Sequence, residues 1–199
     1  MKSKGIAVII VFTAIALSLH PTLSGLAVPS FSPGRYFQFW EIPIFIALLL
    51  LGLKYAITIA VLDNVAVMVI FSGGSVTSWF NIIPLLSTLL GVYLVHRIFS
   101  RRDSKKEMPS KLKEIIFAVP SGYLFRLLIG GPAYYLMLRY LMLMPDPVIF
   151  TKLILNSIHD AILVSYSVPT SYLMAGIIRK KLGIGKKTTS SPSNQFLKD

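Results

Sequence analysis

The fold is decided by residues 37–71, which read FQFWEIPIFIALLLLGLKYAITIAVLDNVAVMVIF and are apolar almost without interruption. A membrane-crossing helix needs about 20 apolar residues, so this stretch is long enough for roughly two crossings. Gly52 and Lys54 lie at its middle, and a glycine beside one cation predicts a tight turn. We therefore expect a transmembrane helical hairpin.

Four residues of this stretch depart from its apolar character. Trp40 and Glu41 lie near its start and are residue types expected at a membrane–water boundary. Asp63 and Asn64 lie in its second half, where contact with lipid is costly. The pattern predicts a membrane protein that holds polar groups in its interior.

Composition agrees with this class. Of the 199 residues, 54% are hydrophobic and only 14% are charged, whereas soluble domains have about 25% charged residues. We predict an all-α membrane protein with a single domain over residues 1–180 and a basic, disordered cytoplasmic tail over residues 181–199. The chain has no cysteine, which excludes disulfides, thiolate catalysis and cysteine-based metal sites.

Six transmembrane helices are expected, with both termini in the cytoplasm. They cover about residues 5–19, the two halves of 37–71, 79–99, 115–141 and 148–178. This topology places 16 of the 20 Lys and Arg residues on the cytoplasmic side, as the positive-inside rule requires. The net charge of +12 is thereby explained by a multi-pass protein of the cell membrane, not by a nucleic-acid partner.

Ionisable residues of three predicted helices fall near the middle of the membrane. At 1.5 Å per residue, Asp63 lies roughly 14 Å and Arg126 roughly 18 Å inside their helices. Asn156, His159 and Asp160 share one helix face through their spacing. Arg126 between Asp63 and Asp160 forms either a structural ion-pair cluster or the wall of a substrate cavity, and both readings stay open.

Polar and aromatic residues also gather near the predicted outer surface. They form either an interfacial belt or the mouth of a cavity whose rings stack on a planar ligand. They are Arg35, Tyr36, Gln38, Trp40, Trp79, Asn81, Tyr134 and Tyr135.

The first helix has a face of small residues. Ala7, Val11, Ala14 and Ser18 align on a 3.6-residue period, and such faces let another helix approach closely. The face serves either ordinary packing within the chain or docking on a partner.

Signatures of catalysis are missing from the sequence. It has no serine in a nucleophile elbow, no paired histidines for a metal and no phosphate-binding loop, so we expect neither enzyme activity nor a cofactor. Without ATP-binding residues, uphill transport would need a partner to supply energy. Two alternatives stay open: an intramembrane enzyme that modifies lipid through His159 and Asp160, and a structural membrane protein.

The chain resembles a substrate-binding (S) component of an energy-coupling factor transporter, nearest to the riboflavin-type members, over about residues 5–180. The resemblance is clearest from Tyr36 to Leu94, in FQFWEIPIFIALLLLGLKYAITIAV, the Gly-rich loop Ser72–Ser75 and WFNIIPLLSTLLGVYLV. These are patterns of moderate specificity.

The resemblance implies capture of riboflavin or a related vitamin-like small molecule in an outward-facing pocket. The substrate-binding residues would be Tyr36, Trp40, Trp79, Asn81, Arg126, Tyr134, Asn156 and His159. It also implies a transmembrane coupling subunit, with two ATPase subunits below it, that docks on Ala7, Ala14 and Ser18. Asn156 matches the family's Asn-x-x-Lys pattern in the sixth helix, whereas His159 replaces the lysine, and Ala133 stands where an asparagine often precedes Tyr134.

Overall fold

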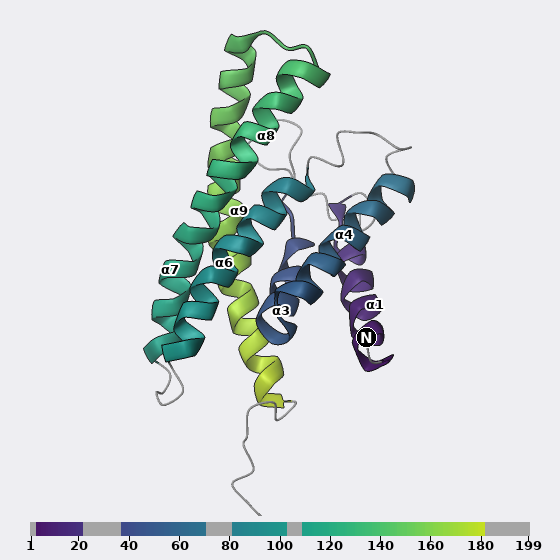
Figure 1. Ribbon diagram of the computed structural model, residues 1–199, viewed down its shortest axis with the longest axis vertical. Coiled ribbons are helices and arrows are strands. Elements are labelled where there is room, and N and C mark those ends of the chain that lie inside the picture. Colours follow the sequence, from purple (N-terminus) through teal and green to yellow (C-terminus); the bar gives the residue numbers. More distant parts are fainter. Residues whose placement is uncertain (1–2, 22–36, 71–80, 103–108, 182–199) are drawn as a thin grey trace, which may run out of the picture.

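The computed structural model describes residues 3–21, 37–70, 81–102 and 109–181, and every regular element within them is helical (Figure 1). Residues 109–141 form one rod that contains two short π-helical segments. The elements are α1 (Ser3–Ser18), α3 (Glu41–Leu51), α4 (Leu53–Ile70), α6 (Ile82–Arg102), α7 (Pro109–Phe125), η1 (Arg126–Gly130), α8 (Gly131–Leu136), η2 (Met137–Leu141) and α9 (Asp146–Lys181).

Four helical stretches in the described part of the chain are long and apolar enough to cross a membrane. They are Leu53–Ile70, Ile82–Ser100, Leu112–Leu141 and Asp146–Lys181. Helices α1 and α3 are apolar but shorter than these four stretches. The predicted all-helical class is confirmed for the described residues, and it includes helices able to span a membrane. The count of six crossings stays a prediction.

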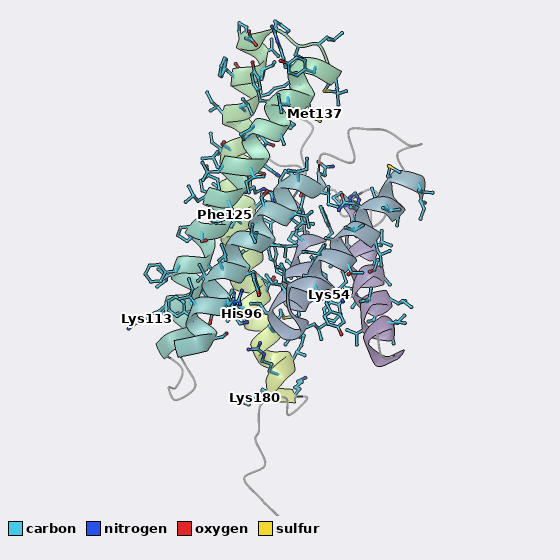
Figure 2. All side chains as sticks on the ribbon, in the orientation of Figure 1. Lys54, His96, Lys113, Phe125, Met137 and Lys180 are labelled. Atoms are coloured by element: carbon cyan, nitrogen blue, oxygen red, sulfur yellow. The ribbon has the colours of Figure 1, made fainter. Side chains whose placement is uncertain are left out.

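The helices alternate in direction along the bundle (Figure 1). α1 begins and α9 ends at the lower end of the view, where α6 also ends and α7 begins. Lys54, Lys113 and Lys180 lie toward this same end (Figure 2). The charge distribution is therefore polarised along the bundle as the sequence predicts, whereas the membrane side of each end stays a prediction. The predicted tail lies almost wholly outside the described residues.

The predicted turn between α3 and α4 is confirmed at Gly52. Its φ of 97° lies in the region that favours glycine. Its backbone N–H donates to the carbonyls of Ala47 at 3.2 Å and Leu48 at 3.0 Å, which closes the last turn of α3.

α3 is the central helix of the bundle. Glu41 and all residues from 43 to 49 are buried, and α3 contacts α1, α4, α6 and α9. Phe45 and Leu48 are among the largest fully enclosed side chains. A helix that is apolar on every side packs in the interior, so the hairpin is asymmetric: α3 forms the core, while α4 exposes Val61 and Leu62.

α6 and α7 approach each other closely at small residues. A Cβ atom added to Gly91 would lie 2.6 Å from the backbone oxygen of Ser121. The Ser121 hydroxyl donates to the Gly91 carbonyl at 3.0 Å, so the contact is also hydrogen-bonded. Small residues at crossing points allow this proximity between membrane helices.

We predict that Gly91→Ala destabilises the protein by about 1–3 kcal/mol, because the added methyl group meets backbone atoms that cannot rotate away. Gly176→Ala is the matched control, since nothing lies within 4 Å of the added atom. Thermal unfolding of the detergent-solubilised variants measures the difference. Equal stability of the two variants would contradict the close crossing.

Candidate functional site

Arg126 lies at the centre of a buried polar cluster. It is the first residue of η1, and its side chain is only 5% exposed. Nη1 donates to the carboxylate oxygens of Glu41 at 3.2 and 3.4 Å, and to the Thr88 hydroxyl at 3.3 Å. Phe125, the preceding residue, lies about midway along the bundle (Figure 2). The guanidinium group thus joins α3, α6 and the α7–η2 rod inside the apolar interior.

α9 contributes the second carboxylate. Asp160 Oδ1 lies 3.0 Å from Arg126 Nε as an ion pair whose geometry is not aligned for a hydrogen bond. One helical turn earlier, Asn156 Nδ2 donates to Asp160 Oδ2 at 2.9 Å. The i, i+4 spacing predicted this shared face. With both carboxylates ionised, the cluster formed by Glu41, Arg126 and Asp160 carries excess negative charge.

A small polar cavity borders this cluster. Its volume is about 20 Å³, and it is lined by Gln38, Asn81, Pro84, Arg126, Tyr134, Asn156 and Asp160. A cavity of this size has room for about one water molecule. Asn156 Oδ1 is buried and has no hydrogen-bond partner among the described residues. The cavity therefore offers a hydrogen-bond acceptor beside a group of charges.

The residues that precede α3, 37–40, are hydrogen-bonded to α9. The Gln38 backbone N–H donates to the Tyr166 hydroxyl at 2.9 Å, and that hydroxyl donates to the Gln38 carbonyl at 3.0 Å. The rings of Phe37 and Phe39 lie 6.0 and 5.9 Å from the Tyr166 ring. Gln38 is thereby held at the cavity wall.

The structure brings half of the predicted substrate-binding residues together. Arg126, Asn156, Tyr134 and Asn81 line one cavity although they come from three different parts of the chain. The sequence left open whether Asp160 belongs to an ion-pair cluster or to a cavity wall. Asp160 also lines this cavity.

Two other predicted substrate-binding residues, Trp40 and His159, do not line this cavity. Trp40 is buried before α3, with its ring 5.6 Å from the ring of His20. His159 is buried in α9 and is not among the lining residues. Tyr36 and Trp79 lie outside the described residues.

The expected partners of Arg126 need a correction. Asp160 is a partner as predicted, but Glu41 takes the place that was assigned to Asp63. Glu41 was expected at the membrane boundary, yet it is only 1% exposed. One signal in the sequence could have identified this partner. Glu41 is an acidic residue at the beginning of a segment that is otherwise apolar.

The small-residue face of α1 is exposed. Ala7, Ala14 and Ser18 all point away from the rest of the described chain, whereas Ile9 and Ala16 on the opposite side are buried. The face therefore does not pack against the described part of the chain, and docking on a partner stays a prediction.

A second polar cluster joins three helices near the lower end of the bundle, close to the labelled His96 (Figure 2). His96 Nδ1 lies 2.5 Å from Glu114 Oε1, and the Tyr172 hydroxyl donates to the same oxygen at 2.9 Å. Glu114 is buried and links α6, α7 and α9.

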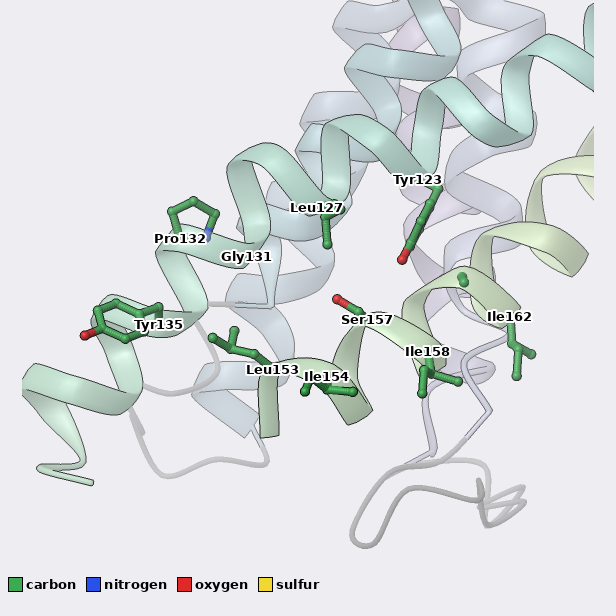
Figure 3. A pocket seen from close by; sticks show the side chains of 11 residues that line it. Tyr123, Leu127, Gly131, Pro132, Tyr135, Leu153, Ile154, Ser157, Ile158 and Ile162 are labelled. Atoms are coloured by element: carbon green, nitrogen blue, oxygen red, sulfur yellow. The ribbon is translucent and has the colours of Figure 1, made fainter. Parts of the chain in front are cut away.

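Two larger apolar grooves lie on the outside of α9. One, of about 600 Å³, lies between the α7–η2 rod and α9 and includes Tyr135, Leu153 and Ile158 in its wall (Figure 3). The other, of about 530 Å³, is lined by Phe37, Phe39, Ile42, Tyr166 and Thr170. Tyr135, which was grouped with the predicted cavity mouth, faces the first of these grooves.

Comparison with protein-family models, with curated proteins and with solved structures finds no match to this chain. Three features of the protein therefore bear on its function: the residues of the polar cavity, the exposed face of α1 and the polarised charge of the bundle.

We predict that Arg126→Met destabilises the protein by about 3–5 kcal/mol, because it leaves Glu41 and Asp160 buried without their cation. Arg139→Met is the matched control. Arg139 pairs with Asp146 at 3.3 Å, but both side chains are more than two-fifths exposed, and such pairs contribute about 0–1 kcal/mol. Thermal unfolding in detergent compares the two variants, and equal losses would contradict the central role of Arg126.

Proposed function

We propose that this protein is a membrane-embedded, high-affinity binding subunit of a vitamin or micronutrient importer of the energy-coupling factor type. The supporting observation is the convergence of Arg126, Asn156, Asp160 and Tyr134 on one polar cavity inside an apolar bundle. Polar groups inside a membrane are costly and typically mark substrate paths. Riboflavin or a related small molecule is the ligand that the sequence resemblance suggests.

The chemistry of the cavity favours a ligand that donates hydrogen bonds. Arg126 Nη1 already donates to Glu41 and Thr88, and Nε lies beside Asp160, so the guanidinium group faces two carboxylates. Asn156 Oδ1 is an acceptor without a partner among the described residues. A ligand with N–H or O–H groups, such as the imide of a flavin or a polyol chain, complements this wall.

Binding a whole vitamin requires movement at the cavity. Small-molecule pockets occupy about 300–1,000 Å³, far more than the 20 Å³ seen here. The cavity walls come from the segment before α3, from α6, from the α7–η2 rod and from α9. Separation of these elements at the upper part of the bundle would admit the ligand while Glu41 and Asp160 keep Arg126 in place.

The exposed face of α1 supports docking on a partner. We propose that a transmembrane coupling subunit packs on Ala7, Ala14 and Ser18, and that two ATPase subunits beneath it supply the energy. Small side chains permit close helix contact in a membrane. In this arrangement six helices cross the cell membrane, and both termini lie in the cytoplasm with the cation-rich end of the bundle.

A lipid-modifying enzyme is less well supported. Its acid or base would have to lie within hydrogen-bond reach of a substrate. Asp160 is instead held by Arg126 and Asn156, and His159 is buried away from the cavity wall.

We expect Asn156→Ala to weaken ligand binding by roughly 5- to 150-fold, because a buried ligand donor loses a partner worth about 1–3 kcal/mol. Native mass spectrometry of the gently solubilised protein identifies any retained ligand, and riboflavin fluorescence quenching is the first titration. Ser157→Ala is the matched control, since Ser157 faces the apolar groove. Equal affinity of both variants would contradict the cavity as the binding site.

We expect Ala14→Trp or Ser18→Trp to abolish uptake by the assembled transporter while ligand binding to the isolated subunit is unchanged, because a bulky side chain prevents close helix contact. Leu173→Trp, which alters an exposed position of α9, should leave uptake intact. Normal uptake by both α1 variants at normal expression would exclude this face as the docking surface.

A further inference from the structure

Asp63 is the buried carboxyl group that the candidate site leaves unused. It lies in the second half of α4, inside a stretch able to cross a membrane, and it is 1% exposed. Neither carboxylate oxygen has a hydrogen-bond partner among the described residues. Its α4 neighbours one turn before, Ile59 and Ala60, belong to the main apolar core. These neighbours one turn earlier on α4 are apolar and cannot stabilise a charge.

Among the described side chains, the elements packed against α4 provide no cation to Asp63. α4 contacts α1, α3 and α6. Residues 5–18 of α1 contain no ionisable side chain. The only ionisable residue of α3 is Glu41, which is bound to Arg126. His96 of α6 is bound to Glu114, and Arg97 lies over the ring of Tyr93.

The remaining ionisable groups of α4 lie near its beginning. Lys54 is exposed and lies nine residues before Asp63, which is about 13 Å along a helix. Tyr55 lies beside Gly5 of α1, where a Cβ atom added to the glycine would be 3.2 Å from its hydroxyl. Thr13 is a hydroxyl-bearing residue in the middle of α1, a helix that packs against α4. Its hydroxyl is buried and also has no hydrogen-bond partner among the described residues.

Polar side chains of α4 that can donate bond to backbone carbonyls one turn earlier in the same helix. Asn64, the next residue, donates to the Ala60 carbonyl at 2.9 Å, and Thr58 donates to the Lys54 carbonyl at 2.9 Å. A protonated Asp63 could donate to the Ile59 carbonyl in the same i to i−4 manner after rotation of its side chain. An ionised carboxylate can only accept, and the N–H groups around it in the helix are already used.

We propose that Asp63 is a proton-binding site, at which the carboxylate takes up one proton from solvent and is held as a neutral acid within the α1–α3–α4 interface. The charge of the side chain changes from −1 to 0, and the bound proton supplies the donor that the helix can satisfy. This site is separate from the Arg126 cluster, in which both carboxylates pair with the same cation.

Infrared spectroscopy of the full-length protein in nanodiscs tests this proposal. Isotopic labelling of aspartate with ¹³C shifts the carbonyl band of any protonated aspartic acid. At neutral pH we expect the wild-type protein to show this shifted band. The band should be absent from Asp63→Asn and retained in Asp146→Asn, a half-exposed acid near Arg139.

Stability gives a second, independent measurement. An exposed aspartate has lost its proton above about pH 5, so the folded protein would bind one proton more than the unfolded chain at neutral pH. Stability of the wild type should then fall as the pH rises, relative to Asp63→Asn, whose amide mimics the neutral acid.

The proposal is overturned if the labelled wild type shows no protonated aspartic acid at neutral pH, or if the band persists in Asp63→Asn. Loss of the band in Asp146→Asn alone would assign the proton elsewhere. The wild-type spectrum requires no substitution, so absence of the band overturns the proposal even if Asp63→Asn does not fold.

Discussion

The ion pairs of Arg126 with Glu41 and Asp160 are the interaction on which the bundle depends. α3 has 11 residues, about 16 Å of helix, whereas the hydrocarbon core of a membrane is about 30 Å thick. Its first turn therefore begins inside the bundle and brings Glu41 with it. A carboxylate at that depth needs a partner, and Arg126 supplies one while Asp160 of α9 binds the other edge of the guanidinium group. Removing Arg126 would leave two buried carboxylates without their cation.

α9 holds α3 in position at both ends. Near the start of α3, Tyr166 exchanges two hydrogen bonds with the backbone of Gln38. At its other end, the Arg179 guanidinium donates to the Leu49 carbonyl, where a cation also interacts favourably with the negative end of the helix dipole. The short core helix α3 is thus bonded to α9 near both of its ends. Its apolar side chains pack against protein.

The proposed binding site uses the same elements at the place where packing is least complete. The rod that carries Arg126 departs from regular α-helix at η1 and η2, and such π-helical segments are frequent at functional sites. The cavity lies between this rod, α6 and α9, and Arg126 and Asp160 of the charge cluster line part of it. Toward the lower end of the bundle, Glu114 instead joins three helices through His96 and Tyr172.

The sequence by itself determined the helical membrane class, the turn at Gly52 and the shared face of Asn156 and Asp160, because these follow from apolar length, glycine conformation and helical periodicity. It also identified Arg126 as a group needing partners. Only the tertiary structure decided that Glu41 is a partner of Arg126 and that Asp63 is not. Depth along a helix can be counted from residue numbers, but which helix becomes the core and which neighbour each face meets depends on packing between segments far apart in the chain.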